Sequence, residues 1–181
     1  MAEIILVTGG ARSGKSSYAQ KRAELLGGRK LFIATCPRID TEMDDRIERH
    51  QRERKGRAWR TVEEQINIAE IIKNNHTSDT ILLDCLTLWV NNLLFSAERE
   101  GALLNEQRIS NICHELIEVS LSHPGTIFFV TNEIGSGIVP ENQAARVYRD
   151  LVGRCNQTIA RKANEVILVS CGIPLTLKSN D

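Results

Sequence analysis

Residues 9–16 of the chain read Gly9-Gly10-Ala11-Arg12-Ser13-Gly14-Lys15-Ser16 and match every fixed position of the phosphate-loop pattern G-x-x-x-x-G-K-[ST]. The apolar run Ile4–Thr8 precedes them and a helical pattern over Lys15–Leu26 follows, which is the strand–loop–helix context that the pattern requires. In such a loop, glycines let successive backbone N–H groups converge on phosphate oxygens, and the helix N-terminus adds a positive potential. We therefore expect a nucleoside triphosphate here, with Lys15 at its β- and γ-phosphates and the Ser16 hydroxyl on Mg²⁺.

Short apolar runs alternate with longer amphipathic stretches along the whole chain. The predicted strands are Ile4–Thr8, Lys30–Thr35, Thr80–Asp84, Thr126–Thr131, Glu165–Ser170 and Leu175–Lys178. The predicted helices are Lys15–Leu26, Thr41–Lys55, Val62–Asn74, Leu86–Ala97, Glu106–Ser122 and Asn142–Ala163. The first five strands are almost continuously apolar, which is typical of parallel strands that are buried on both faces.

This alternation predicts an α/β fold. We expect a single P-loop domain over residues 1–181, with a mostly parallel, twisted sheet and helices on both faces. The tight-turn signal Cys171–Pro174 indicates that the last strand returns antiparallel at an edge of the sheet. Residues 56–70 are the least regular part after the first helices.

Composition and charge exclude several classes of protein. A chain of 181 residues with 41% hydrophobic side chains is of ordinary globular composition, and a domain of this size buries about 70% of its unfolded surface. The 23 basic and 23 acidic side chains balance. A general nucleic-acid or membrane-surface binder needs a basic excess or a basic face, so we expect neither partner.

The cysteines and the N-terminal sequence indicate a cytoplasmic enzyme or nucleotide switch. There are 5 cysteines, and no C-x-x-C motif occurs among them, so a reducing compartment is expected. No uninterrupted apolar run approaches the roughly 18 residues of a membrane span. The first strand begins at Ile4, which leaves no room for a signal peptide.

An aspartate ends the third predicted strand, Ile81-Leu82-Leu83-Asp84. An acid at this position is typical of the second acidic motif of P-loop proteins, and Asp84 is therefore a candidate for the Mg²⁺ shell, directly or through water. The alternative interpretation is an N-cap for the helix that begins near Leu86. An aspartate could serve both purposes.

A nucleotide site alone does not separate a switch from an enzyme. A signalling GTPase normally carries an N-K-x-D segment and a D-x-x-G switch, whereas here Asp84 is followed by Cys85-Leu86-Thr87 and no N-K-x-D occurs. The nearest segment, Thr131–Gly135, lacks both the lysine and the aspartate. A small-molecule kinase or a nucleotidyltransferase is the class that remains.

His50 is the first candidate for a functional role among the 4 histidines, although the residues alone do not define its reaction. Met43, Ile47 and His50 share one face of the predicted helix Thr41–Lys55, so the ring is expected to face the protein body or a cleft. Arginines at positions 46, 49, 52 and 54 disfavour the imidazolium and keep the ring nucleophilic. The alternative is a histidine on the helix surface or at an interface. No histidine pair has zinc-ligand spacing.

Five blocks of sequence carry a resemblance to a known family. They are Thr8–Ser16, the helix segment Glu42–His50 (E-M-x-x-R-I-x-x-H), Trp59–Glu63, Val130–Pro140 and Gly153–Gln157 (G-R-x-N-Q). In this order they resemble the bifunctional adenosylcobinamide kinase/adenosylcobinamide-phosphate guanylyltransferases of cobalamin synthesis. The resemblance covers residues 4 to 178.

The resemblance implies a function that the motifs alone do not define. Such enzymes phosphorylate adenosylcobinamide with ATP or GTP, then transfer GMP from GTP to adenosylcobinamide phosphate through a covalent histidine, here His50. It implies a RecA-like fold and a homotrimer. The implied nucleotide contacts are the phosphate loop Gly9, Gly10, Ala11, Arg12, Ser13, Gly14, Lys15 and Ser16, then Ala34, Thr35, Cys36, Gln51, Arg52, Glu53, Arg54, Glu63 and Asp84. Cys36 stands where serine is common in relatives.

Two other functions are compatible with the phosphate loop. A kinase of another small alcohol would keep Lys15 and Asp84 but would not need His50, and a nucleotide-binding regulator would not turn over. Ligands of open α/β sheets bind at the carboxyl ends of the strands, and the segment Val139–Glu141 follows the fourth predicted strand. We therefore expect this segment to form a wall for the corrinoid.

Overall fold

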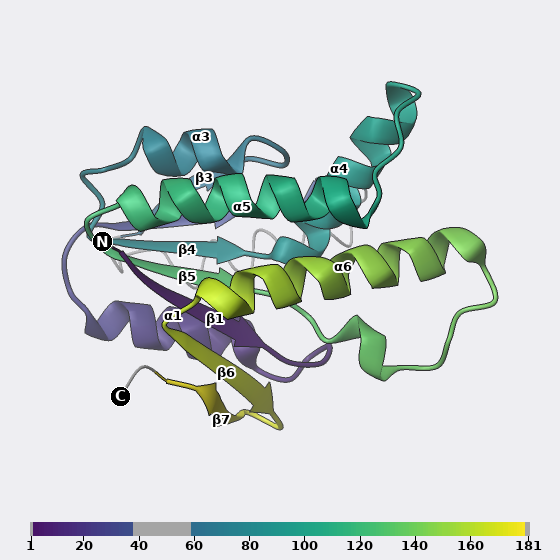
Figure 1. The fold of residues 1–181 in the computed structure, drawn as a ribbon. Helices are drawn as coiled ribbons and strands as arrows, with labels where there is room; N and C mark the ends of the chain where they lie inside the picture. Colours follow the sequence, from purple (N-terminus) through teal and green to yellow (C-terminus); the bar gives the residue numbers. More distant parts are fainter. Residues whose placement is uncertain (1, 38–58, 180–181) are drawn as a thin grey trace.

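The computed structural model describes residues 2–37 and 59–179, which form one seven-stranded sheet with helices on both faces (Figure 1). The strands are β1 (Glu3–Thr8), β2 (Lys30–Ala34), β3 (Trp59–Glu63), β4 (Thr80–Asp84), β5 (Thr126–Val130), β6 (Glu165–Ser170) and β7 (Ile173–Lys178). The helices are α1 (Lys15–Leu25), α3 (Ile68–Lys73), α4 (Leu86–Arg99), α5 (Glu106–Ser122) and α6 (Gln143–Lys162), with a 3₁₀ turn η1 (Ile134–Ser136).

The sheet has the order β3-β2-β4-β5-β1-β6-β7. The first six strands in sequence pair in parallel, and β7 pairs antiparallel with β6 at the edge. Both features confirm the predicted α/β class and the antiparallel edge strand. Strand β1, which carries the phosphate loop, lies between β5 and β6. Strands β2 to β5 lie on one side of β1 and strands β6 and β7 lie on the other, so the strand order reverses at β1.

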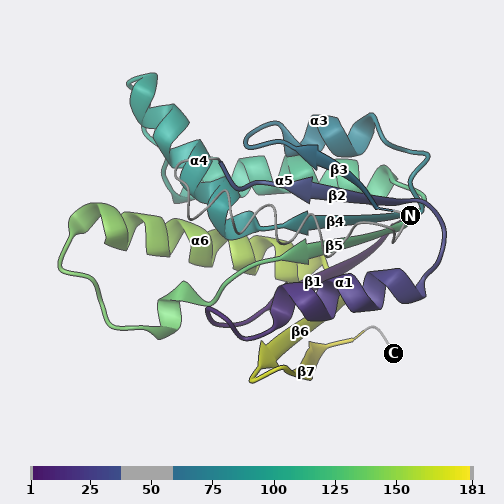
Figure 2. The same cartoon turned by 180° about the vertical axis from the view of Figure 1, so that it is seen from behind.

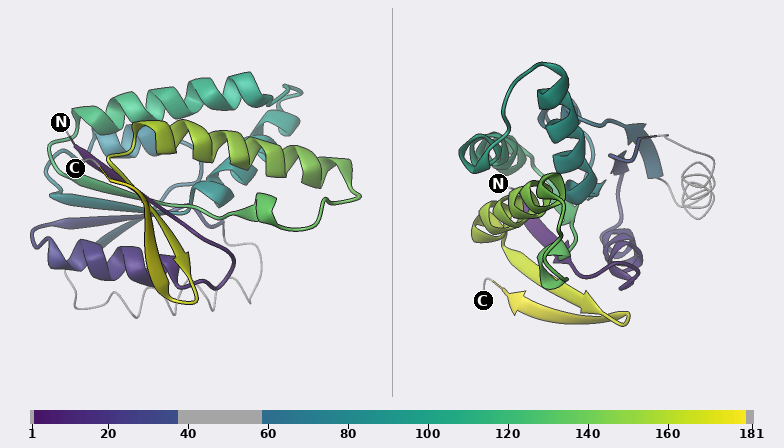
Figure 3. Two further views of the ribbon diagram at one scale, coloured as in Figure 1. Left: turned by 60° about the horizontal axis from the view of Figure 1, so that its bottom comes forward. Right: turned by 90° about the vertical axis from the view of Figure 1, so that its right-hand side faces the viewer.

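The two faces of the sheet are covered unequally. Helix α1 covers one face (Figure 2). Its Ala19 and Ala23 pack on Val7, Phe128 and other strand side chains. Helices α3, α4, α5 and α6 cover the other face, and Figure 3 shows α5 and α6 across the sheet from α1.

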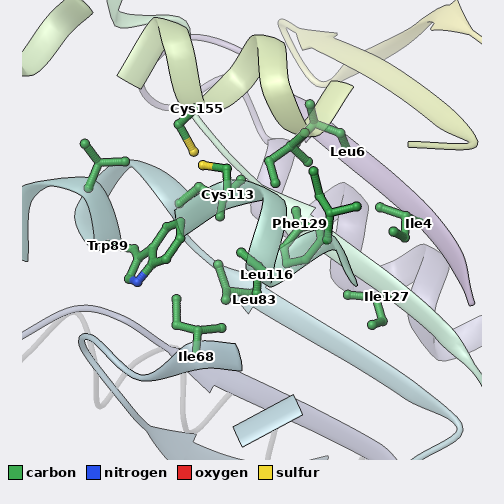
Figure 4. Close-up of a cluster of buried hydrophobic side chains, with 14 of the residues drawn as sticks. Ile4, Leu6, Ile68, Leu83, Trp89, Cys113, Leu116, Ile127, Phe129 and Cys155 are labelled. Carbon is green, nitrogen blue, oxygen red and sulfur yellow. The ribbon is translucent and has the colours of Figure 1, made fainter. Parts of the chain in front are cut away.

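The larger core lies beneath these four helices. Figure 4 shows Trp89 of α4 and Leu116 of α5 in one cluster with Leu83 and Phe129 of the central strands. All four side chains are almost fully buried. Strands with burial on both faces explain why their sequences are continuously apolar.

The structure corrects one region of the predicted secondary structure. Trp59–Glu63 forms the edge strand β3, where the sequence predicts irregular chain, and the helix predicted over 62–74 begins only at Ile68. The side chains of β3 are half-buried or exposed, so its sequence lacks the apolar signal of a central strand. The Glu64 carboxylate accepts the N–H groups of Ile66 and Asn67 at 2.8 Å, which places a turn before α3. The predicted helix Thr41–Lys55 lies outside the described residues.

Candidate functional site

The described candidate residues follow the carboxyl ends of four parallel strands. Ala34 at the end of β2 is in register with Glu63 of β3 on one side and with Asp84 of β4 on the other. Asp84 is in register with Val130 of β5. Registered residues of neighbouring strands share a face, and Val130 packs on the α1 face, so Asp84 lies on the face covered by the phosphate-loop helix.

The phosphate loop adopts a conformation that few residues tolerate. Gly9 has φ 154°, Arg12 φ 58° and Gly14 φ 92°. A Cβ on Gly9 would lie 2.3 Å from the backbone oxygen of Val169, so no larger residue fits without moving β6. Arg12 and Gly14 both have left-handed backbone conformations. In phosphate loops, such residues let backbone N–H groups converge on a bound anion.

Lys15 lies folded back over its own loop, where its Nζ donates to the carbonyl oxygen of Gly10 at 3.0 Å. The Ser13 hydroxyl is buried and has no hydrogen-bond partner among the described residues. An unpartnered buried hydroxyl is costly, about 1–3 kcal/mol, unless a ligand completes its hydrogen bonding. The loop therefore offers an ammonium group and a hydroxyl to an anion.

The residues around the loop also fit a magnesium ion. The Ser16 hydroxyl in the first turn of α1 and the Asp84 carboxylate are hard oxygen ligands, which Mg²⁺ prefers. Magnesium in such sites takes one or two protein ligands and fills the rest of its shell with phosphates and water. Residues 2–37 and 59–179 contain no cluster of three His, Cys, Asp or Glu side chains that could hold a metal ion.

The N-cap alternative for Asp84 is wrong, because the N-cap residue of α4 is Cys85 and no side chain caps that helix. Burial raises the pKa of the Cys85 thiol to about 12, the Asp84 carboxylate adds to the rise, and the Lys15 ammonium opposes it. Asp84 and Lys15 therefore both lie near the Cys85 thiol and act on its pKa in opposite directions. That thiol stays protonated at neutral pH and cannot serve as a nucleophile.

Thr35 locks the end of β2 to the end of β4. Its hydroxyl donates to the carbonyl oxygen of Cys85 and accepts the Cys85 N–H, both at 2.8 Å. Its own N–H donates to the carbonyl oxygen of Asp84, and its carbonyl oxygen accepts from Asn92 Nδ2 at 2.8 Å. Every polar group of Thr35 thus has a partner within the protein, and the residue fixes the position of Asp84.

Two supports of the phosphate loop are contacts that the sequence does not predict. The Gly172 N–H, in the turn between β6 and β7, donates to the carbonyl oxygen of Ser13 at 2.8 Å. The Thr8 hydroxyl donates to Oε1 of Glu133 at 2.6 Å, and the Glu133 N–H donates to the Gly9 carbonyl oxygen at 3.3 Å. Glu133 follows β5, and only the strand order places it beside the loop after β1.

A buried network holds the chain after β5 against α6. The Thr131 hydroxyl donates to Oδ1 of Asn156 at 2.6 Å and lies 3.3 Å from the Thr87 hydroxyl. Asn156 Nδ2 donates to the carbonyl oxygen of Asn132 at 3.1 Å, and the Tyr148 hydroxyl donates to the Thr87 carbonyl oxygen at 3.1 Å. The asparagine of the G-R-x-N-Q block therefore has a structural use, which is to position the segment that carries Glu133.

One cavity, which we call the loop cavity, has a volume of about 670 Å³ and lies on the β6 side of the phosphate loop. It is lined by Thr8, Gly10–Ser13, Glu133, Ser136, Leu168–Cys171 and Leu177. Lys15, Ser16 and Asp84 lie outside this cavity. The loop thus has two sides, one toward this cavity and one toward the registered strand-end residues Glu63, Ala34 and Asp84.

A second cavity, the α6 cavity, has a volume of about 420 Å³. Its lining comes from α6 (Arg149, Asp150, Gly153, Arg154 and Gln157), from the segment after β5 (Gly135, Gly137 and Val139) and from Glu106 of α5. The expected corrinoid wall, Val139–Glu141, contributes Val139 to this lining.

Several predicted site residues lie outside the described part of the chain. They are His50, Gln51, Arg52, Glu53 and Arg54, so their contacts with the loop stay predictions. Within the described ranges, no helix is long and apolar enough to cross a membrane.

The fold and this loop define a P-loop nucleotide-binding protein with RecA-like architecture. The crystal structure of the RadB recombinase superposes with a TM-score of 0.51 over 92% of this chain and 73% of that chain. Sequence identity is only 14%, so this similarity supports the fold alone.

Sequence comparison defines the family. The chain belongs to the cobinamide kinase / cobinamide phosphate guanyltransferase family, whose model matches residues 5–177. It is 42% identical over 184 residues to the bifunctional adenosylcobalamin biosynthesis protein CobU of Escherichia coli (strain K12), covering 97% of this chain and 99% of the relative. The CobU protein of Salmonella typhimurium is 41% identical at the same coverage, and CobP of Pseudomonas aeruginosa is 37% identical over 96% of each chain. The chain is accordingly a bifunctional kinase and guanylyltransferase.

Proposed function

We propose that the chain phosphorylates the aminopropanol hydroxyl of adenosylcobinamide with ATP or GTP and then transfers GMP from GTP onto that phosphate. The observation that carries the proposal is the phosphate loop. Its Ser13 hydroxyl is buried without a hydrogen-bond partner among the described residues, and its Lys15 ammonium lies over the loop, so both can bind an anionic ligand. Family membership supplies the identity of the acceptor.

The kinase step attacks the γ-phosphorus, so charge develops at the oxygen between the β- and γ-phosphates. The loop N–H groups and Lys15 are placed to stabilise that charge. Ser16 and Asp84 would hold Mg²⁺, which neutralises phosphate charge when bound. Further nucleotide contacts are proposed at the same edge of the sheet, from Ala34, Thr35, Cys36 and Glu63.

The guanylyl transfer attacks the α-phosphorus and releases pyrophosphate. We propose His50 as the nucleophile that forms a covalent GMP adduct, because this divides one displacement into two easier ones. Gln51, Arg52, Glu53 and Arg54 are proposed as nucleotide contacts beside it. This part of the proposal rests on the sequence.

The quaternary structure and the compartment are also part of the proposal. We propose a homotrimer, and an exposed apolar strip on β7 supports association between copies: Ile173 is 70% exposed and Leu175 and Leu177 are each 57% exposed. Light scattering should give three times the chain mass of 20.3 kDa. The free cysteines agree with a reducing cytoplasm.

The deciding experiment uses GTP labelled at the α-phosphate. Wild-type protein should become covalently labelled, and His50→Ala should lose both the label and the formation of adenosylcobinamide-GDP while retaining part of its kinase activity. The adduct should be acid-labile and base-stable, as a P–N bond is. A kinase of another alcohol would never be labelled, and a GMP adduct mapped to any residue other than His50 contradicts the proposed nucleophile.

A further inference from the structure

Most glycines in the described part of the chain have a conformational or steric reason to be glycine, but four do not. Gly10, Gly135, Gly137 and Gly153 have no φ in the left-handed range. A Cβ at three of these positions would meet nothing described within 4 Å, and at Gly137 it would meet only Ile134 O at an ordinary 3.8 Å. Gly10 belongs to the phosphate loop, where the close approach of a ligand explains the glycine. The other three all line the α6 cavity.

We propose that the α6 cavity binds the amide-bearing edge of the corrinoid in both acceptor substrates, and that these glycines leave the space the corrinoid occupies. The inference rests on the proposed function, since it names the place where that acceptor sits. A volume of about 420 Å³ is near the lower end of small-molecule sites, roughly 300–1,000 Å³. The cavity therefore holds one edge of a large macrocycle and leaves the remainder in solvent.

Gly153 is the most informative of the three glycines. It lies inside the 20-residue helix α6, where glycine is a poorer helix former than alanine. Because the described protein leaves room for a side chain there, packing within the chain does not explain the glycine. A ligand that lies flat against the helix backbone does explain it.

The charges of the cavity favour a neutral ligand that carries hydrogen-bonding groups. Arg154 Nε donates to Oε2 of Glu106 at 2.8 Å, and Arg149 lies 3.4 Å from the Asp150 carboxylate. Each arginine in the lining is thus paired with an acid in the same lining. A free phosphate would meet two carboxylates here, whereas amide groups can donate to the acids and accept from the arginines and from Gln157.

The cavity is also held in shape and placed beside the phosphate loop. Arg146 of α6 donates to the carbonyl oxygens of Pro140 and Glu141 at 2.9 and 2.5 Å, which fixes the outer wall. Glu133 and Ser136 line the loop cavity, whereas Gly135 and Gly137 line the α6 cavity. Residues in and beside the 3₁₀ turn η1 thus line both cavities, so a flexible arm of the bound corrinoid has only this turn to cross.

The test fills the floor of the cavity with Gly153→Leu. Binding of adenosylcobinamide is measured without nucleotide by equilibrium dialysis, with detection by the visible absorbance of the corrinoid. We expect the Kd to rise about 10-fold or more, since a side chain then occupies the space of the ligand. The KM values for adenosylcobinamide and for its phosphate should rise by the same factor, because both carry the same corrinoid. The Kd for GTP and the covalent labelling by GTP should stay unchanged.

Ala144→Leu is the matched control, because it adds the same side chain to an exposed position of α6 outside the cavity lining. It should change none of these values. If Gly153→Leu fails to fold, Gln157→Ala decides instead, and it should raise the Kd for adenosylcobinamide about 3- to 10-fold through the lost amide partner.

Several results would overturn the inference, and they differ from a failure of the proposed function. A wild-type protein that neither binds nor converts adenosylcobinamide refutes both. If wild-type protein binds and converts adenosylcobinamide, and folded Gly153→Leu binds it with the same Kd, the cavity assignment alone is refuted. Weaker GTP binding by Gly153→Leu would make the cavity a site for the nucleotide base, and a changed mass by light scattering would make it a contact between copies.

Discussion

The hydrogen bond between Thr131 and Asn156 offers a quantitative test of how the segment after β5 is held. Asn156→Ala removes two hydrogen bonds, one from the Thr131 hydroxyl at 2.6 Å and one to the Asn132 carbonyl oxygen at 3.1 Å. Thr131 is fully buried, so its hydroxyl keeps only the contact with Thr87 at 3.3 Å. At about 1 kcal/mol per hydrogen bond, with a further penalty for the poorly satisfied hydroxyl, the expected loss in the free energy of unfolding is about 2–3 kcal/mol.

The companion variant Thr131→Val has almost the same shape and removes the donor. Its expected loss is about 1–2 kcal/mol, because water can partly satisfy the half-buried Asn156 that remains. If the two side chains share one hydrogen bond, the double variant should lose about 1 kcal/mol less than the sum of the single variants.

Urea unfolding followed by circular dichroism gives all three free energies. Thr176→Val on the exposed face of β7 is the control, and this surface change should stay within about 0.5 kcal/mol of wild type. Single-variant losses that add to the double-variant loss within about 0.3–0.5 kcal/mol would refute the reasoning, since independent sites behave in that way.

Three further predictions concern the loop, a buried histidine and the thiols. Lys15→Ala should lower both activities by roughly 10²–10³-fold with an unchanged circular dichroism spectrum, because Lys15 contacts the triphosphate and neither acceptor. Near-normal guanylylation by a folded variant would contradict this prediction. Burial lowers the pKa of His123, whose ring accepts the Gly125 N–H at 3.0 Å. Below about pH 6.5, the unfolded chain therefore binds a proton at this histidine more readily than the folded protein does. Stability should therefore fall as the pH drops through that value, and the slope of Tm against pH between 7.5 and 5.5 should be shallower in His123→Gln; equal slopes would exclude His123 as the cause. Cys171 is exposed and lines the loop cavity, so a thiol reagent should modify it first and GTP should slow that reaction. Cys155 is fully buried, and its hydrogen bond with Cys113 and its burial raise the pKa of its thiol. Cys155 should therefore react only after unfolding. Labelling of Cys171 that is insensitive to GTP would place the nucleotide away from the loop cavity.

The central strands could be predicted from the sequence because their burial on both faces leaves a continuous apolar run. The predicted bounds of Thr80–Asp84 and Glu165–Ser170 agree with β4 and β6 at both ends. The same rule fails for β3, whose side chains are only partly buried at the edge of the sheet. A short polar strand has no periodic signal, and its pairing with β2 is a property of the assembled sheet.

The phosphate loop was predictable because its chemistry needs particular residues at fixed spacing, whereas its supports were not. Glu133 lies beside Thr8 only because β5 pairs with β1, and the contact joins residues 125 positions apart. Gly172 reaches the Ser13 carbonyl oxygen only because β7 turns back at the edge. Such contacts depend on strand order, which a single sequence does not specify.

The segment 133–141 combines a weak sequence signal with strong constraints in the structure. It carries exposed apolar side chains, with Ile138 95% exposed, and contains no regular element beyond the short turn η1. Yet one end is tied to the phosphate loop through Glu133, and the other is tied to α6 through Arg146. In the proposed function this segment lies between the nucleotide and the corrinoid. It then needs such ties, because an attacking oxygen reacts efficiently only when held about 3–3.5 Å from the phosphorus. Hydrogen bonds at both ends can supply that order to a loop whose own sequence favours no single conformation.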